Sequence, residues 1–239
     1  MLKKRVDLIE FYSQIGAIEE LFKIINSKNS QLEQNAAFKA QKSIVIDPAK
    51  NSHLEASQRY ILSLIKAKEL HAFAEFIMNY MVHNRFKNIS SVPNNTIIVS
   101  EHLGMGDYEI VSKINLFDHT INCAISSIEI CKEQPQVIRD IVMVICLLHD
   151  AGKSPSVQKE FKNKNEAHDV LSARFSKEAM QDFDISDELQ RSIFVTLFNH
   201  HNEDKNKEQT MYSSFLVASD VTARKLEKKF ILSRERGLK

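Results

Sequence analysis

A strongly apolar stretch of the sequence ends in two residues that can bind metal ions. In ICLLHDAGKSP, residues 145–155, a run of aliphatic side chains is followed by His149 and Asp150. Residues 138–148 are apolar nearly all round, which is typical of a central, buried helix. The C-terminus of a helix carries a negative partial charge, so an anionic Asp150 is unfavourable there unless a cation lies close by. A bound metal ion is one such cation.

Four further segments place a histidine or an aspartate on the apolar face of a predicted helix. In each case, helical spacing to a nearby apolar residue defines that face. Burying an ionisable group costs several kcal/mol unless it is compensated, so several such groups in one domain suggest a shared cause. Together with the first pair, the candidate metal ligands are His119, His149, Asp150, His168, His200, His201 and Asp220.

Each of these residues also has an ordinary explanation. A lone inward histidine is usually a hydrogen-bonded core residue, and Asp220 is spaced to pair with Arg224 on its own helix. A divalent cation explains the whole set at once, because it neutralises carboxylates and binds neutral imidazole nitrogens. Spacing alone names neither the metal nor the reaction.

The order of these residues resembles that of a known family. A histidine, a His-Asp pair followed by x-Gly-Lys, and a distant aspartate form the signature of the HD-domain metal-dependent phosphohydrolases. Here they are His119, HDAGK at residues 149–153, and Asp220 in ASDVTAR. The resemblance covers about residues 109–225, and it implies an all-α domain in which these histidines and aspartates surround a first metal ion.

The two-metal branch of that family has extra histidines between the His-Asp pair and the last aspartate. The segments EAHDVLSARF and FNHHNED look like those places, which implies His168 and His200 as ligands of a second metal ion and Asp150 as the bridge. His201 is either a further ligand or a neighbour that points away. The subgroup that acts on cyclic dinucleotides is a poorer match, because the Gly-Tyr-Pro segment expected after HHNED is absent.

The resemblance implies a hydrolase that cleaves a phosphate mono- or diester, of a nucleotide or a nucleic-acid end, with a metal-activated hydroxide. Asp150 and Lys153 are the expected catalytic residues, and Lys153 is also expected to bind a phosphate oxygen. One or two divalent transition metals are implied, and histidine ligands favour Mn, Fe, Ni or Zn over Mg. Asp118 and Asp169 adjoin candidate ligands, so each either orients a histidine, shuttles a proton or is exposed.

Two other functions stay open. The run from NLFDHTINCAISS to LLHDAGKSP also resembles HD modules of relaxases from conjugative elements, which suggests a DNA-processing module with a structural or vestigial metal site. A few relatives of this fold carry out oxygen chemistry at a di-iron centre. A basic C-terminal tail is either a DNA contact or a solvated helix face; its residues are Arg224, Lys225, Lys228, Lys229, Arg234, Arg236 and Lys239.

Composition favours an all-α protein. The chain has 239 residues, 43% of them hydrophobic, and its five glycines and four prolines provide few of the short turns that all-β folds need. We expect an N-terminal helical region at 1–92, a linker at 93–108 with one short strand at 96–99, an HD-domain helical bundle at 109–232 and a tail at 233–239. Within the bundle, helices are predicted at 109–132, 136–149, 166–181, 186–200 and 210–232.

Charge and cysteine content bear on partners and location. A formal charge of +1 gives no global reason to expect nucleic acid, so a phosphate-containing small molecule and a nucleic-acid substrate are both open. Cys123, Cys131 and Cys146 lack metal-binding spacing and indicate reduced thiols in a cytoplasmic protein. The longest strongly apolar run, 141–148, is too short to span a membrane. The N-terminal region is expected to act as a lid or as a homodimer contact, and the chain is compatible with being a fragment of a longer protein.

Overall fold

The computed structural model describes residues 48–92, 110–161, 166–201 and 209–235. Contacts divide the chain into two units, Met1–Ala56 and Ser57–Lys239, and every candidate site residue lies in the second. The described residues form α-helices and short 3₁₀ turns, with an isolated β-bridge between Ser90 and Asn115. The prediction of an all-α fold is therefore confirmed for these residues.

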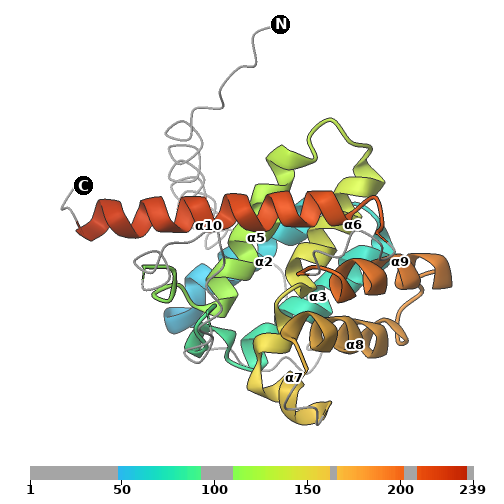
Figure 1. Ribbon diagram of the computed structural model, residues 1–239, viewed down its shortest axis with the longest axis horizontal. Coiled ribbons are helices and arrows are strands. Elements are labelled where there is room, and N and C mark those ends of the chain that lie inside the picture. The colour runs from blue at the N-terminus through green and yellow to red at the C-terminus, as the bar shows by residue number, and fades with distance from the viewer. Residues whose placement is uncertain (1–47, 93–109, 162–165, 202–208, 236–239) are drawn as a thin grey trace, which may run out of the picture. The chain divides into compact units, whose positions relative to one another are not determined.

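Eight α-helices follow one another along the described part of the chain (Figure 1). They are α2 (Pro48–Leu64), α3 (Lys68–His83), α5 (Leu116–Ile130), α6 (Gln136–Leu148), α7 (Pro155–Glu160), α8 (His168–Met180), α9 (Asp187–Phe198) and α10 (Ser213–Glu235). The 3₁₀ turns are η2 (Phe86–Asn88) and η3 (Ala151–Lys153). Helix α6 contacts α3, α5, α8, α9 and α10, and it therefore forms the centre of the bundle.

Helix α6 has the environment that its sequence predicts. Every residue from Asp140 to Leu148 is buried, as expected for a helix that is apolar on all sides. The helix ends directly before His149, so the buried end of the bundle's central helix delivers the His-Asp pair.

Two helix predictions need correction. Helix α5 begins at Leu116 rather than near residue 109, because the Asn115 side chain accepts a hydrogen bond from the Asp118 N–H and caps the helix there. Helix α7 lies in a stretch predicted to be a loop. The available signal was Pro155, which occupies the first turn of this short helix, where a proline is tolerated.

Some predictions fall outside the described residues. These are the helices within 1–47 and the strand at 96–99. The boundary between an N-terminal region and the HD bundle at residue 92 stays a prediction, although α3 packs against α6. Among the described helices, none combines the length and hydropathy that crossing a membrane would require.

A buried acid in α6 fixes the turn between α2 and α3. Asp140 is 2% exposed, and its Oδ2 atom accepts hydrogen bonds from the backbone N–H groups of Lys66 and Ala67 at 2.9 and 2.8 Å. Its Oδ1 atom accepts a hydrogen bond from the Gln136 side chain at 2.6 Å. Asp140 therefore attaches the start of α3 to the central helix.

We expect Asp140→Ala to lower the free energy of unfolding by about 2–4 kcal/mol, because it leaves two backbone donors without their charged acceptor. Urea denaturation measures this change. The control Asp182→Ala removes an exposed acid and should change stability by no more than about 0.5 kcal/mol. Equal effects of the two variants would contradict the role assigned to Asp140.

Candidate metal centre

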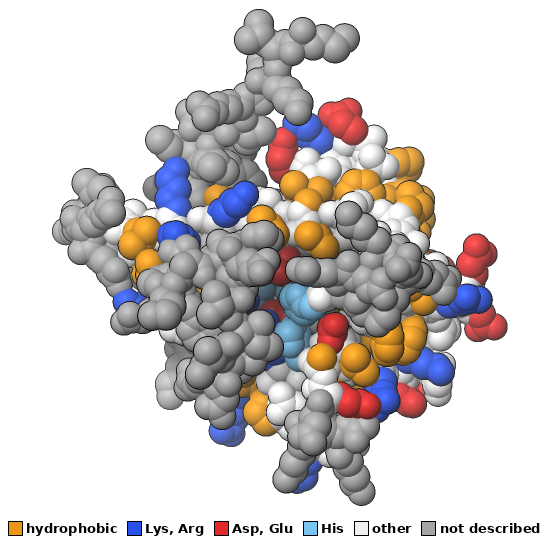
Figure 2. Space-filling view, in the orientation of Figure 1, with side chains coloured by type: hydrophobic (Ala, Val, Ile, Leu, Met, Phe, Trp, Pro, Cys, Tyr) orange, Lys and Arg blue, Asp and Glu red, His pale blue; other side chains and the backbone are white. Residues whose placement is uncertain are grey.

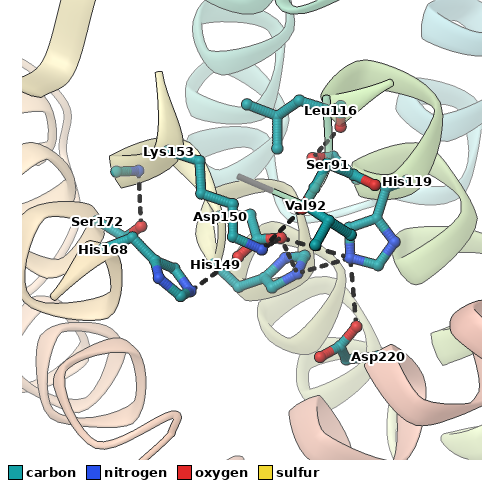
Figure 3. Close-up of polar contacts among 12 residues, drawn as sticks. Ser91, Val92, Leu116, His119, His149, Asp150, Lys153, His168, Ser172 and Asp220 are labelled. Atoms are coloured by element: carbon teal, nitrogen blue, oxygen red, sulfur yellow. Dashed lines mark hydrogen bonds and ion pairs between the residues drawn. The ribbon is translucent and has the colours of Figure 1, made fainter. Parts of the chain in front are cut away.

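Four ligand atoms from three parts of the chain converge at the buried end of α6. The Nε2 atoms of His119, in α5, and His149 lie 3.3 Å apart. The Oδ2 atom of Asp150 lies 3.4 Å from each of them, and Oδ1 of Asp220, in α10, lies 3.2 Å from Nε2 of His119. Figure 3 shows these four side chains pointing toward one another.

The distances between these atoms suit one shared metal ion. Transition metals bind histidine nitrogens and carboxylate oxygens at about 2.0–2.2 Å, so ligand atoms around one ion lie about 3.0–3.6 Å apart. The measured separations of 3.2–3.4 Å fall in this range. His119, His149 and Asp220 therefore form a group that could hold a divalent ion, and Asp150 borders this group with its Oδ2 atom.

Hydrogen bonds on the far side of each ring select the tautomer that binds metal. Nδ1 of His149 donates to the backbone oxygen of Cys146 at 2.7 Å. Nδ1 of His119 lies 3.0 Å from Oε1 of Glu227 and donates to that carboxylate. In both rings Nε2 is therefore the nitrogen that faces the other ligand atoms, as in metal sites whose histidines are held by an outer acceptor.

Asp150 faces a second group of ligands with its other oxygen. Its Oδ1 atom lies 3.3 Å from Nε2 of His168, the first residue of α8, and has no well-formed hydrogen bond among the described residues. A ring nitrogen of His201 completes the group, in which all ligand atoms lie within 4.8 Å of one another. His201 is exposed, yet desolvation and the neighbouring imidazoles lower its pKa to about 3, so its ring is neutral at neutral pH.

The two adjacent histidines after α9 lie beside different residues. Nε2 of His200 lies 3.5 Å from Oδ2 of Asp220, and its ring meets that of His149 edge-on at 5.4 Å between centroids. The ring of His201 lies 4.7 Å from that of His168. The geometry therefore groups His201, rather than His200, with His168, and the ligand roles themselves stay predictions.

Asp150, which is buried, and Asp220, which is partly buried, are both ionised. Desolvation alone would raise the pKa of Asp150, but Lys153 and His149 hold it well below its usual range. Desolvation also opposes ionisation of Asp220, yet the neighbouring His119 and His200 lower its pKa well below the ordinary value. Both carboxylates are therefore negatively charged at neutral pH and available to a cation.

The two buried imidazoles behave differently. Desolvation lowers the pKa of His149, even though Asp150 lies beside it. For His119, desolvation and Arg224 act to lower the pKa, but Glu227 and Asp220 outweigh them, and the pKa is raised. Protons therefore compete with a metal ion for Nε2 of His119, and metal affinity weakens as the pH falls through this raised pKa.

Two positively charged side chains, those of Lys153 and Arg224, lie beside Asp150, and both bind Ser91. Nζ of Lys153 lies 2.7 Å from Oδ2 of Asp150 and donates to the backbone oxygen of Ser91 at 3.0 Å. Arg224 donates to the hydroxyl and to the backbone oxygen of Ser91 at 2.8 and 3.2 Å. Its Nη2 and Nε atoms lie 3.9 Å from Asp150 and Asp220, respectively. At these separations Arg224 forms ion pairs with the two carboxylates but no hydrogen bonds to them.

A comparison with protein families finds an HD-domain match over residues 116–232. This part of the chain is an HD domain. The match spans His119, the His149–Asp150 pair and Asp220, the residues on which the resemblance rests, and the resemblance is thereby confirmed. Searches of curated proteins and of solved structures gave no significant match.

Packing requires the glycine of HDAGK in this HD domain. A Cβ atom at Gly152 would overlap the backbone oxygen of His168 and lie 2.8 Å from Cβ of Leu171. The N–H of Gly152 also donates to Oγ of Ser172 at 2.8 Å. Turn η3 therefore lies directly against the first turn of α8, and this contact positions His168.

Sequence analysis missed Glu227, which holds His119 in place. Glu227 is buried in α10, and its Oε1 atom accepts hydrogen bonds from Nδ1 of His119 at 3.0 Å and from the Asn122 side chain at 2.9 Å. Burial opposes its ionisation, but His119 and Arg224 lower its pKa. The spacing of Asp220, Arg224 and Glu227, at i, i+4 and i+7, places them on one helix face and was the signal available in the sequence.

We expect Glu227→Ala to weaken metal affinity by about 10–100-fold, because His119 loses the acceptor that orients its ring. Glu227→Gln keeps an acceptor oxygen and should lose less. Titration of the metal-free protein with Mn²⁺ or Zn²⁺ measures both effects, and Glu178→Ala, an exposed acid in α8, is the control. Wild-type affinity in Glu227→Ala would refute the positioning role.

The two acids next to candidate ligands lie at helix starts. Oδ2 of Asp118 accepts a hydrogen bond from the Asn115 side chain at 2.7 Å, within the cap of α5. Oδ1 of Asp169 accepts a hydrogen bond from the N–H of Val170 at 2.9 Å, at the start of α8. Both contacts support helix ends, and in the part of the chain that the structure describes neither contact is made to a histidine.

Arg224 does not belong to an exposed basic tail. Its side chain is 14% exposed and turned toward the metal centre, whereas Lys225 and Lys229 are exposed on the second half of α10. The side chains of Arg234, Arg236 and Lys239 lie outside the described residues. A DNA contact by the remaining basic residues stays a prediction.

Proposed function

We propose that this HD domain is a metal-dependent phosphohydrolase that cleaves a phosphate mono- or diester. The observation that carries the proposal is the convergence of His119, His149, Asp150 and Asp220 at 3.2–3.4 Å, with Asp150 also facing His168. Divalent ions held there would activate water and neutralise charge on the phosphate. Imidazole ligands suit Mn, Fe, Ni or Zn better than Mg.

Asp150 is the bridging residue in this proposal. One of its oxygens faces His119 and His149, and the other faces His168. Among the described residues, it is the carboxylate that reaches both groups of candidate ligands. Its lowered pKa keeps both oxygens free of protons over the physiological pH range.

Lys153 and Arg224 are the phosphate-binding cations in this proposal. Both lie within 4 Å of Asp150, so phosphate oxygens placed beside Asp150 come within reach of both side chains. The ammonium and the guanidinium donate charge-assisted hydrogen bonds to such oxygens and stabilise the charge that develops during the reaction. Ser91 holds both cations in position before any substrate arrives, so little reorganisation is needed.

The test uses protein stripped of metal and reloaded separately with Mn, Fe, Ni, Zn or Mg. We expect hydrolysis of p-nitrophenyl phosphate or of bis(p-nitrophenyl) phosphate with at least one transition metal. His149→Ala should lower the rate by about 10³-fold, as expected when a group that organises the reacting centre is lost. Activity that persists unchanged in His149→Ala would remove the proposal.

The same preparation separates the two alternative functions. A DNA-processing module with a structural metal site predicts metal binding and DNA binding without hydrolysis of either ester. A di-iron oxygenase predicts oxygen consumption by the iron-loaded protein.

We expect the HD domain to stay folded when a chelator removes its metal. The positive charges of Lys153 and Arg224 offset most of the negative charge of Asp150, Asp220 and Glu227 in the metal-free site. The loss should be limited to the stabilisation by binding, about 3 kcal/mol at a hundredfold excess of metal over its dissociation constant. Circular dichroism and thermal melting with and without EDTA measure it, and unfolding by EDTA at 25 °C would contradict this balance.

A further inference from the structure

A serine that precedes the HD domain holds the arginine beside the metal centre. Ser91 lies before the matched range of 116–232 and is fully buried. Its hydroxyl accepts a hydrogen bond from Nη1 of Arg224 at 2.8 Å, and its backbone oxygen accepts one from Nη2 at 3.2 Å. Nη1 also donates to Oε2 of Glu227 at 3.2 Å. The bond to the Ser91 hydroxyl is the shortest of these three.

Backbone hydrogen bonds fix Ser91 ahead of α5. Its N–H donates to the backbone oxygen of Ile114 at 3.0 Å, and the N–H of Leu116 donates to the backbone oxygen of Ile89 at 2.7 Å. Leu116 is the first residue of α5, the helix that carries His119. Ser91 is therefore attached to the same helix start that positions a candidate metal ligand.

Arg224 lies close to two oxygen atoms that face the candidate ligand His119. Nη2 of Arg224 lies 3.9 Å from Oδ2 of Asp150, and its Nε atom lies 3.9 Å from Oδ1 of Asp220. The same two oxygens lie 3.4 and 3.2 Å from Nε2 of His119. Charge-assisted hydrogen bonds to carboxylates are about 2.7–2.9 Å long, so a shift of roughly 1 Å would bring the guanidinium onto these oxygens.

A cation from solution has to compete with this guanidinium. The side chains of His168 and Asp220 are 29% and 19% exposed, and Figure 2 shows histidine and acidic side chains together at the surface of one face of the molecule. Ions therefore reach the centre from solvent. Arg224 is attached to the chain beside the carboxylates, so it acts at a much higher effective concentration than a free ion.

We propose that Ser91 is a positioning residue that keeps Arg224 from forming hydrogen bonds with the carboxylates of the metal centre. The inference rests on the metal centre of the proposed function but not on ester hydrolysis. With the Ser91 hydroxyl in place, the guanidinium is held away from Asp150 and Asp220, and both stay available to a divalent ion. Without it, Arg224 moves closer to them and weakens metal binding.

The test removes the hydroxyl and measures metal affinity. Ser91→Ala keeps the backbone oxygen that holds Lys153. Calorimetry of metal-stripped protein with Mn²⁺ should show a dissociation constant about tenfold higher than that of the wild-type protein, on the scale of one hydrogen bond to a charged group. Ser90→Ala is the matched control. It removes the neighbouring hydroxyl, which donates to the backbone oxygen of Ser112 at 3.0 Å, and it should keep the wild-type affinity.

A second variant guards against misfolding of the first. Ser91→Cys keeps nearly the same side-chain volume and offers only a weak acceptor in place of the hydroxyl. Its dissociation constant for Mn²⁺ should rise in the same direction as that of Ser91→Ala.

A double-mutant cycle tests whether Ser91 acts through Arg224. Arg224→Ala removes the competing guanidinium, so this variant should bind Mn²⁺ at least as tightly as the wild-type protein. In the Arg224→Ala background, Ser91→Ala should change the dissociation constant less than about twofold. An equal rise in both backgrounds would mean that Ser91 supports only the fold, and it would overturn the inference.

Hydrolysis of the two p-nitrophenyl esters is measured in parallel, so that this inference and the proposed function can fail separately. Weaker Mn²⁺ binding in Ser91→Ala that disappears in the Arg224→Ala background, without hydrolysis of either ester by the wild-type protein, supports the role of Ser91 and removes the hydrolase. Hydrolysis by the wild-type protein, with unchanged Mn²⁺ affinity in Ser91→Ala and Ser91→Cys, overturns the role of Ser91 and leaves the hydrolase standing.

Discussion

Asp150→Asn is expected to lower kcat/KM for phosphate-ester hydrolysis by on the order of a thousandfold or more. Asp150 places one oxygen 3.4 Å from the Nε2 atoms of His119 and His149, and the other 3.3 Å from Nε2 of His168. The amide of asparagine has only one oxygen. That oxygen can face either the pair His119 and His149 or His168, so the other side loses its oxygen ligand. Elemental analysis should therefore show a lower metal content in the variant than in the wild-type protein.

The matched control is Asp169→Asn, which also neutralises a buried acid. Asp169 bonds the N–H of Val170 at the start of α8, so its variant should keep both its metal and most of its activity. If Asp169→Asn lost as much activity as Asp150→Asn while keeping its metal, Asp169 would instead act as a proton shuttle. A fully active Asp150→Asn would contradict the bridging role and, with it, the proposed centre.

Helical periodicity was sufficient to predict the inward faces that bring the centre together. His119 and Asp220 each lie on an apolar stripe, and His149 directly follows a helix that is apolar on all sides, so these side chains are expected to meet in the core of a bundle. The side chains do meet, at the end of the central helix α6. The places of His200 and His201 could not be predicted in this way, because α9 ends at Phe198 and helical periodicity does not apply beyond it.

Arg224 and Ser91 show a second limit of the sequence. Arg224 stands among lysines in the sequence, a pattern typical of a solvated helix face. Its spacing to Asp220 on the same helix indicates an inward direction, but its hydrogen bonds to the hydroxyl and carbonyl of Ser91, which lies 133 positions earlier in the chain, do not follow from that spacing. Local sequence carries no information about such a contact, since it is set by the packing of distant segments.

The geometry of the histidines supports a metal ion more strongly than the burial of ionisable groups does. The sequence predicts a shared cation because several ionisable groups face the core. In the structure, Lys153 and Arg224 already compensate the carboxylates, so burial alone no longer requires a metal. The stronger support is geometric: Nε2 of His149 faces Nε2 of His119 at 3.3 Å while the opposite nitrogen of each ring is occupied by an acceptor.

Gly152→Ala is expected to lower the free energy of unfolding by about 3 kcal/mol, at the upper end of the usual cost of overpacking a core. The added methyl group would overlap the backbone oxygen of His168 and crowd Leu171, so α8 must move away from η3. A shift of about 1 Å in a residue of the reacting centre can reduce the rate on the order of a hundredfold. Urea denaturation and kcat/KM measure the two effects.

Ser172→Ala separates the steric effect of this change from the loss of a hydrogen bond. It removes the hydroxyl that accepts from the Gly152 N–H and should cost about 1 kcal/mol. If Gly152→Ala cost no more than Ser172→Ala, close packing would not explain the glycine. His119, His149 and Asp220 do not lie on α8. The Gly152→Ala variant should therefore still bind a metal ion at these three residues, and it should lose any metal ion that His168 binds. A variant that lost both equally would show that η3 supports Asp150 itself rather than the placement of α8.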